Sequence, residues 1–237
     1  MKTIVVLGMH RSGTSMIAGI LSHLGVNMGN DLIGERPFNP RGHFENKEFL
    51  AMNVDILLVN GGSWAKPPSR EAILASGKHF DSRIEDVINR SKSSLWGWKE
   101  PRTSLTIDLY YPYLENPYFI VCYRKAEDIA RSIAERAETM TQEDVPFEFS
   151  RDLTRAYNDR IKVFFKAHPK EKRLNIFYDN VIDNPEKYVR KIASFLKLKP
   201  NRAAIDFIMN PEEKKKEKKA ALDEQVDKVK KLIKEHE

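Results

Sequence analysis

The chain has 237 residues, of which 41% are hydrophobic and 31% are charged, and it carries a formal net charge of +6 and one cysteine. This length and apolar content suit one globular domain with its own core and exclude a disordered or fibrous protein. A single cysteine excludes an intramolecular disulfide and any zinc or iron–sulfur site built on several thiolates. No apolar stretch approaches the ~20 residues of a membrane span, and the start lacks a full signal-peptide pattern. We therefore expect a cytoplasmic enzyme or binding protein, and the positive charge favours an anionic partner.

Four short and nearly continuous apolar runs predict strands that are buried on both faces: Thr3–Leu7, Ser94–Trp98, Pro117–Tyr123 and Leu174–Tyr178. Helical patterns lie between and after them: Thr14–Leu24, Asn46–Val59, Glu71–Arg90, Ala126–Glu138, Phe147–Ala167 and Pro185–Leu196. This alternation predicts an α/β fold, a three-layer sandwich with a central parallel sheet and helices on both faces. We expect residues 1–210 to form this domain.

Two segments stand apart in composition. Gly25–Gly42 is rich in glycine, asparagine and proline, and it predicts a long loop over the carboxyl edge of the sheet that acts as a lid. Residues 211–237 combine many charges with an apolar stripe at helical spacing, which predicts a charged amphipathic helix. That helix either packs on its own domain or pairs with a partner, such as the second copy of a homodimer.

The first predicted strand runs into the sequence Gly8-Met9-His10-Arg11-Ser12-Gly13-Thr14-Ser15 and then into a helix. A strand, a glycine-bounded turn and a helix amino terminus form an anion site, because backbone N–H groups and the helix dipole converge there. Gly8 and Gly13 have the spacing of a nucleotide-binding P-loop, so we expect a P-loop-type sandwich. The lysine of nucleoside-triphosphate enzymes is replaced by Thr14, and the cation of the loop is Arg11. The loop therefore suits a phosphate-like group better than a triphosphate with magnesium, and we expect no metal.

A second cation follows the third predicted strand. Arg124 comes directly after it, where α/β folds bind their ligands, and Ser132 lies about two helical turns further on. This pair predicts a site for a second phosphate, separate from the first.

The two motifs together, HRSGTS and CYRKAEDIARS, resemble those of the 3′-phosphoadenosine 5′-phosphosulfate (PAPS)-dependent sulfotransferases. The segments WGWKEPRTSL, NPRGHFENKEF and FYDNVIDNPEKYVRKIASFLKL are also similar to bacterial members and to members that sulfate carbohydrates or tyrosine, and the resemblance covers roughly residues 3–198. It implies that PAPS is the co-substrate. The residues that it assigns to the 5′-phosphosulfate are Arg11, Ser12, Gly13, Thr14 and Ser15. It assigns the 3′-phosphate to Arg124 and Ser132, and places Tyr178 near the adenine, with core packing as the alternative.

The chain departs from the cytosolic small-molecule sulfotransferases in three ways. They carry a lysine where this chain has Arg11, and they end in an Arg-Lys-Gly loop that is missing here. None of the six histidines is a clear counterpart of their catalytic histidine. His10 is a candidate contact for donor or acceptor, and His43 is a candidate substrate contact because it neighbours Glu45.

The chemistry requires a base, stabilisation of the sulfuryl oxygens and a cation on the departing phosphate oxygen. Our candidate base is Glu45, and the alternative is that its carboxylate caps the helix that begins near Asn46. Arg11 and Lys99 are candidate catalytic cations. Lys99 and Arg102 are candidates for sulfuryl, leaving-group or substrate contacts, and the alternative for them is a surface ion pair with Glu100.

The leading hypothesis is transfer of a sulfuryl group from PAPS to a hydroxyl of a carbohydrate or small molecule, which releases adenosine 3′,5′-bisphosphate. The alternatives are a P-loop nucleotide or small-molecule kinase and a nucleotide-binding module without turnover. We expect no nucleic-acid partner, because the cations fall at strand ends and no nucleic-acid motif occurs. Gly25–Gly42 and Trp64–Phe80 are expected to shape the acceptor pocket, and their polar and tryptophan content favours a sugar or small hydroxylated acceptor.

Overall fold

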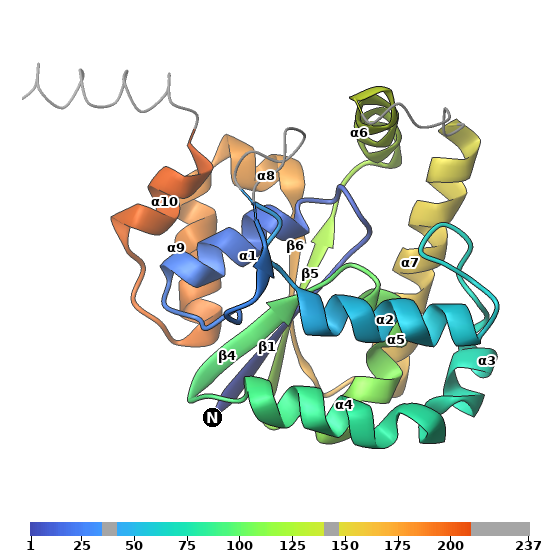
Figure 1. Ribbon diagram of the computed structural model, residues 1–237. Coiled ribbons are helices and arrows are strands. Elements are labelled where there is room, and N and C mark those ends of the chain that lie inside the picture. Colours follow the sequence, from blue (N-terminus) through green and yellow to red (C-terminus); the bar gives the residue numbers. More distant parts are fainter. Residues whose placement is uncertain (35–41, 140–146, 210–237) are drawn as a thin grey trace, which may run out of the picture.

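The computed structural model describes residues 1–34, 42–139 and 147–209 (Figure 1). The amphipathic helix predicted for residues 211–237 lies outside these ranges. Within them, no helix combines the length and the apolar character needed to cross a membrane.

The sheet has six strands in the order β2-β3-β4-β1-β5-β6. Its long strands are β1 (Lys2–Leu7), β4 (Leu95–Lys99), β5 (Pro117–Tyr123) and β6 (Lys172–Phe177), which pair in parallel as predicted. The two short strands β2 (Leu32–Ile33) and β3 (Glu45–Asn46) were not predicted, because two residues carry no periodic pattern. β3 is parallel to β4, whereas β2 is antiparallel to β3 and lies within the segment that we predicted as a loop.

The pairing register brings the carboxyl ends of the strands to one edge of the sheet. Val6, near the end of β1, pairs with Lys99 on one side and with Ile120 on the other. Lys99 also pairs with Glu45 of β3. Side chains that follow these strands therefore project into one region.

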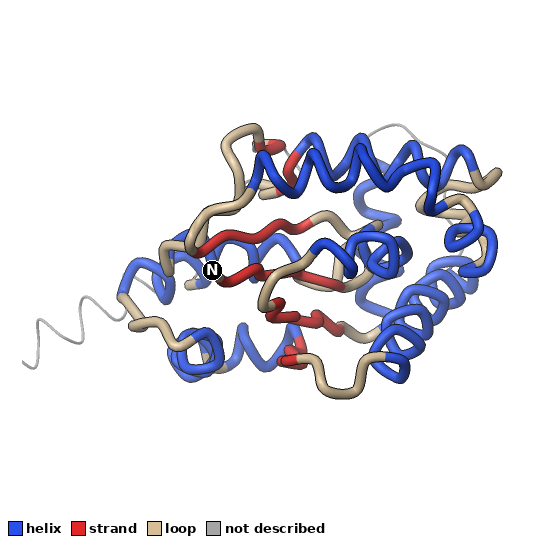
Figure 2. The backbone as a smooth tube through the Cα atoms, turned by 90° about the horizontal axis from the view of Figure 1, so that it is seen from below, coloured by secondary structure: helices blue, strands red, loops and turns tan. Residues whose placement is uncertain are grey.

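Helices cover both faces of the sheet, as Figure 2 shows. One face carries α1 (Thr14–His23), α8 (Tyr178–Asp183), α9 (Pro185–Leu196) and α10 (Arg202–Ile208). The other carries α2 (Lys47–Val59), α3 (Arg70–Ala75), α4 (Gly77–Ser91), α5 (Thr103–Tyr110), α6 (Ala126–Thr139) and α7 (Phe147–Ala167), and a short 3-10 helix, Tyr111–Tyr113, follows α5. The predicted three-layer α/β sandwich is confirmed.

Strand β1 joins the two cores, because its side chains alternate between the faces of the sheet. Val5 and Leu7 pack under the larger helical layer, and Ile4 and Val6 pack under α1. All four are fully buried. Each contributes about 1.5–3 kcal/mol through burial, which fixes the strand that carries the glycine-bounded loop.

One helical prediction needs correction, and the helices α5, α8 and α10 were not predicted. The pattern over Glu71–Arg90 predicted one helix, but the chain forms α3 and α4 with a break at Ser76, which ends one and begins the other. The close approach of Gly77 to α5 accompanies the break, since a Cβ there would lie 3.1 Å from Leu109. Helix α5 was missed because nearly all of its residues are buried, so it has no amphipathic stripe.

Candidate active site

The loop after β1 has a backbone that only a few residue types tolerate. Gly8 and Gly13 have φ values of 150° and 91°, and Arg11 has a φ of 66°. A Cβ on Gly13 would lie 2.5 Å from the ring of Tyr178. Glycine is therefore required at position 13, both for its left-handed backbone and for the close approach of Tyr178.

The first turn of α1 opens onto this loop. Gly13 is the residue before the helix and provides no side-chain cap. Ser12 turns its hydroxyl back onto the carbonyl of Met9, at 2.7 Å, and Thr14 is buried. The amino end of the helix therefore keeps its backbone donors and positive dipole for an anion.

Arg11 links this loop to α6. Its Nε donates a hydrogen bond of 2.8 Å to Oγ of Ser132. The two residues are 121 positions apart and were assigned from the sequence to different phosphates of one donor. The structure brings the two predicted anion sites into direct contact.

Arg124 completes this cluster at the end of β5. Its Nη1 donates to the carbonyl of Arg11 at 3.2 Å, which supports the left-handed loop backbone. Its guanidinium lies 4.3 Å from the ring centre of Tyr178, the first residue of α8. Among the described residues, the buried Nε of Arg124 has no hydrogen-bond partner. An unpaired buried donor on a side chain that contacts the loop at Arg11 fits a site for an anionic oxygen.

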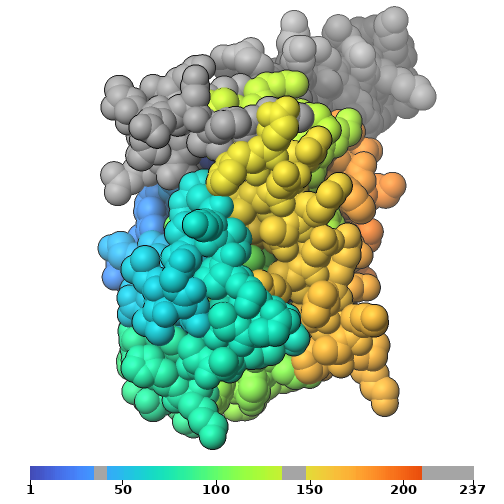
Figure 3. Space-filling model, turned by 90° about the vertical axis from the view of Figure 1, so that its right-hand side faces the viewer, coloured from blue at the N-terminus to red at the C-terminus, as the bar shows by residue number. Residues whose placement is uncertain are grey.

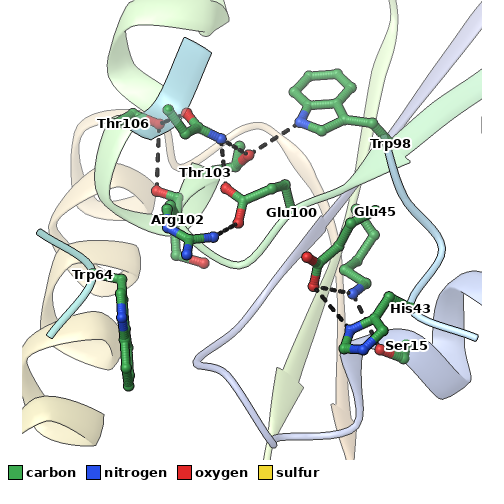
Figure 4. A network of polar contacts seen from close by, with 12 residues as sticks. Ser15, His43, Glu45, Trp64, Trp98, Glu100, Arg102, Thr103 and Thr106 are labelled. Carbon is green, nitrogen blue, oxygen red and sulfur yellow. Dashed lines mark hydrogen bonds and ion pairs between the residues drawn. The ribbon is translucent and has the colours of Figure 1, made fainter. Parts of the chain in front are cut away.

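Lys99 and Glu45 form a second cluster. Figure 4 shows Glu45 with His43 and Ser15 beside it. Nζ of Lys99 donates to Oε1 of Glu45 at 2.7 Å and to Oγ of Ser15 at 3.1 Å. The Lys99 side chain is fully buried at the end of β4, and Glu45 is buried beside it on β3. The helix cap that we considered for Glu45 is made by Asn46, whose side chain accepts from the amides of α2.

The charges of Glu45 and Lys99 shift each other's pKa values. Burial acts to raise the pKa of Glu45, but Lys99, with a smaller contribution from His43, holds that pKa well below its usual range. Burial lowers the pKa of Lys99 in spite of Glu45. Glu45 is therefore ionised at neutral pH and able to accept a proton.

His43 lies beside this pair, and His10 lies in the loop. Nδ1 of His43 lies 3.9 Å from Oε1 of Glu45. The ring of His10 lies edge-on to Trp64, with centroids 4.9 Å apart, and 6.1 Å from that of Tyr157. Figure 3 shows α7 beside the segment that joins α2 to α3, where Tyr157 donates to the carbonyl of Trp64 at 3.0 Å. Trp64 and Tyr157 thus form an aromatic wall near the loop.

Arg102 forms the ion pair with Glu100 that the sequence analysis gave as an alternative, but this pair is not on the surface. Glu100 is fully buried, and the side chain of Arg102 is 15% exposed. Lys99 takes no part in this pair and binds Glu45 instead.

Sequence reasoning missed several residues of this region. Glu100 was considered only as a surface partner, and Asn53 and Tyr157 received no role, whereas Trp64 was expected only as part of the segment Trp64–Phe80 that shapes the acceptor pocket. An asparagine inside the apolar pattern of α2 was the one available signal, because a buried amide needs hydrogen-bond partners.

The site therefore has several cations and hydroxyls that can bind an anion, and one carboxylate that can accept a proton. No group of three or more histidine, cysteine, aspartate or glutamate side chains that could hold a metal occurs in the described ranges.

Comparison with known proteins agrees with this chemistry. The model of a family described as "Sulfotransferase family" matches residues 3–201. No curated protein sequence is significantly similar to this chain.

Two solved structures are similar in fold. The sulfotransferase domain from the curacin biosynthetic pathway is 16% identical, with a TM-score of 0.54, over 87% of this chain and 77% of that chain. The sulfotransferase domain from the Synechococcus PCC 7002 olefin synthase is 17% identical, with a TM-score of 0.57, over 89% of this chain and 78% of that chain.

Proposed function

Because this chain belongs to the sulfotransferase family, we propose that it transfers a sulfuryl group from PAPS to a hydroxyl of a carbohydrate or small molecule. It is a PAPS-dependent enzyme, and the product on the donor side is adenosine 3′,5′-bisphosphate.

The 5′-phosphosulfate is held by the loop and the start of α1. Arg11 supplies a guanidinium, Ser12 and Gly13 supply the turn, and Thr14 and Ser15 supply hydroxyls at the helix end. The left-handed loop backbone and the uncapped start of α1 support this assignment.

The 3′-phosphate is held by Arg124 and Ser132, with the adenine near Tyr178. The observation that supports this assignment is the buried, unpaired Nε of Arg124 among the described residues. The cation–π contact between Arg124 and Tyr178 fixes the guanidinium plane. An arginine and a hydroxyl so placed give charge-assisted hydrogen bonds to a phosphate.

Glu45 is the general base. It accepts the proton of the acceptor hydroxyl while the bond from that oxygen to sulfur forms and the bond from sulfur to the phosphate oxygen breaks. Lys99 and Arg11 stabilise the charge on the sulfuryl and departing oxygens. His10, His43 and Arg102 lie on the acceptor side.

The ion pair also controls the strength of the base. A carboxylate bonded to Lys99 holds protons weakly, because its pKa is lowered. When Lys99 turns toward the sulfuryl oxygens, Glu45 loses that partner and becomes more basic. The base is thus strongest when the sulfuryl group is in place.

The single observation that carries the proposal is the position of Lys99, whose ammonium contacts both Glu45 and Ser15. One cation thus contacts both the candidate base and the anion site, so the two lie close enough for an acceptor hydroxyl at Glu45 to approach a sulfuryl group held at the start of α1.

The test is incubation of the protein with ³⁵S-labelled PAPS and a panel of sugars, phenols and alcohols, without added metal. We expect label in at least one acceptor and equimolar adenosine 3′,5′-bisphosphate. Tight binding of the bisphosphate with no transfer to any acceptor would instead support a binding module.

A further inference from the structure

Glu100 is a fully buried carboxylate at the end of β4 and the start of α5. Its Oε2 accepts a hydrogen bond of 2.7 Å from Nδ2 of Asn53 on α2, and its Oε1 accepts from Nη1 of Arg102 (Figure 4). Each carboxylate oxygen therefore accepts a hydrogen bond from a neighbouring side chain, and these two bonds hold the carboxyl group in place.

The amide of Asn53 is itself held in one orientation. Its other hydrogen bonds are a donation to Thr103 at 2.9 Å and acceptances from Thr106 at 2.6 Å and Tyr110 at 3.0 Å. Trp98 donates to Thr103 at 3.1 Å. Residues from α2, β4 and α5 thus fix the position of Glu100, and such a satisfied network is rigid.

Arg102 is the member of this network that has hydrogen-bond donors left for another molecule. Its guanidinium has five N–H donors, and Glu100 is its one hydrogen-bond partner among the described residues. A buried ion pair is a weak source of stability, because desolvation offsets the attraction between the charges. The network therefore fixes an arginine that keeps most of its donors for another molecule.

In Figure 4, Arg102 and Trp64 lie on one side of Glu100, and Glu45 and Ser15 lie on the other, so we assign the side of Arg102 and Trp64 to the acceptor. The charges of Glu100 and Arg102 both act on the hydroxyl of Tyr157, which donates to the carbonyl of Trp64. Trp64 in turn packs against His10 of the loop. Lys99, by contrast, reaches the start of α1.

We propose that Arg102 binds an acidic group of the acceptor, and that Glu100 is the positioning residue that fixes Arg102 and moderates its charge. The acceptor would then be a hydroxylated molecule that already carries a carboxylate, sulfate or phosphate. This inference rests on the proposed sulfotransfer, because it concerns the acceptor side of that site.

The experiment uses two matched pairs of probes: methyl β-glucoside with methyl β-glucuronoside, and 4-methylphenol with 4-hydroxyphenylacetate. Binding of each probe to protein saturated with adenosine 3′,5′-bisphosphate is measured by ligand-observed NMR. Wherever a probe is sulfated, KM and kcat are measured as well. Since a charged hydrogen bond is involved, we expect the acidic member of at least one pair to bind about tenfold more tightly or better.

Two variants separate positioning from a general structural role. Arg102→Gln should abolish the tighter binding of the acidic member. Where the acidic probe is sulfated, the loss should appear as a higher KM and not as a lower kcat. Glu100→Gln keeps an acceptor oxygen for Arg102 but no longer neutralises its charge, so it should increase the preference. Arg90→Gln is the matched control, because Arg90 is exposed and pairs with Glu48, which takes no part in this network. It should change nothing.

The outcomes decide the inference. No preference for either acidic probe, or a preference that survives Arg102→Gln, would overturn the role of Arg102. An equal loss of affinity for both members of a pair in Glu100→Gln would overturn the positioning role. If Glu100→Gln does not fold, the Arg102 variant still decides the acceptor class. Binding of adenosine 3′,5′-bisphosphate is measured separately in each variant. It tests the proposed donor site independently of the acceptor site.

Discussion

The ammonium group of Lys99 donates a hydrogen bond to the carboxylate of Glu45 across 2.7 Å, between neighbouring strands of the sheet. Both side chains are buried, so this contact joins a carboxylate and a cation in a region of low dielectric. In our proposal the same two groups are the base and the sulfuryl contact of the transfer.

Replacing Glu45 by glutamine should lower kcat by about 10²–10⁴-fold, because the variant has no group to take the acceptor proton. Binding of adenosine 3′,5′-bisphosphate should stay within a few-fold of the wild-type value. Steady-state kinetics and calorimetry measure the two effects.

The neighbouring Asn46→Ala variant is its control. Asn46 caps α2, so its loss should cost about 1 kcal/mol of stability with little change in kcat. If Glu45→Gln keeps most of the activity, Glu45 is not the base.

Replacing Lys99 by methionine should destabilise the fold by about 3–5 kcal/mol, because it leaves the buried carboxylate of Glu45 without its cation. The double variant with Glu45→Gln should recover a large part of that loss. Urea denaturation of both variants measures the coupling, and additive losses in the double variant would show that the pair is not coupled.

Replacing Ser132 by alanine should weaken binding of adenosine 3′,5′-bisphosphate about tenfold, through loss of one charge-assisted hydrogen bond. Binding of adenosine 5′-phosphate, which has no 3′-phosphate, should change much less. Arg131→Gln is the control, since Arg131 is exposed on the same helix. An equal loss for both nucleotides would contradict the assignment of Ser132 to the 3′-phosphate.

Glu100 should make stability depend on pH. Burial raises its pKa from an ordinary 4.5 to about 7, with Arg102 acting in the opposite direction. Between these values the folded protein holds a proton that the unfolded chain releases, so stability is lost as the pH rises through about 7. Relative to Glu100→Gln, the wild type should lose at most about 3 kcal/mol between pH 5 and pH 7, and little more above that. Urea denaturation across this range measures the difference, and a parallel pH dependence in both proteins would contradict it.

The sequence was sufficient for the elements that carry a periodic or continuous apolar pattern. The four long strands are predictable because each is a nearly continuous apolar run. The loop from Gly8 to Ser15 is predictable because a strand, a glycine-bounded turn and a helix start follow one another directly. The places of Arg124 directly after β5 and of Ser132 in α6 are also predictable, because a continuous apolar run and a helical pattern mark these two elements.

Contacts between distant segments could not be predicted in this way. Glu45 meets Lys99 only because a strand of two residues, β3, pairs with β4, and so short a strand has no pattern. Glu100 and Asn53 meet inside the core, 47 positions apart, where a charged residue in a polar motif would be expected at the surface. Arg11 and Ser132 were assigned separately, and their direct bond depends on the left-handed backbone at Arg11.

The most direct test of the central claim is calorimetric titration of the protein with adenosine 3′,5′-bisphosphate and, separately, with ATP and magnesium. We predict tight binding of the bisphosphate that needs no metal, and much weaker binding of ATP with magnesium. Preference for ATP with magnesium, or equal binding of nucleotides with and without the 3′-phosphate, would contradict the account.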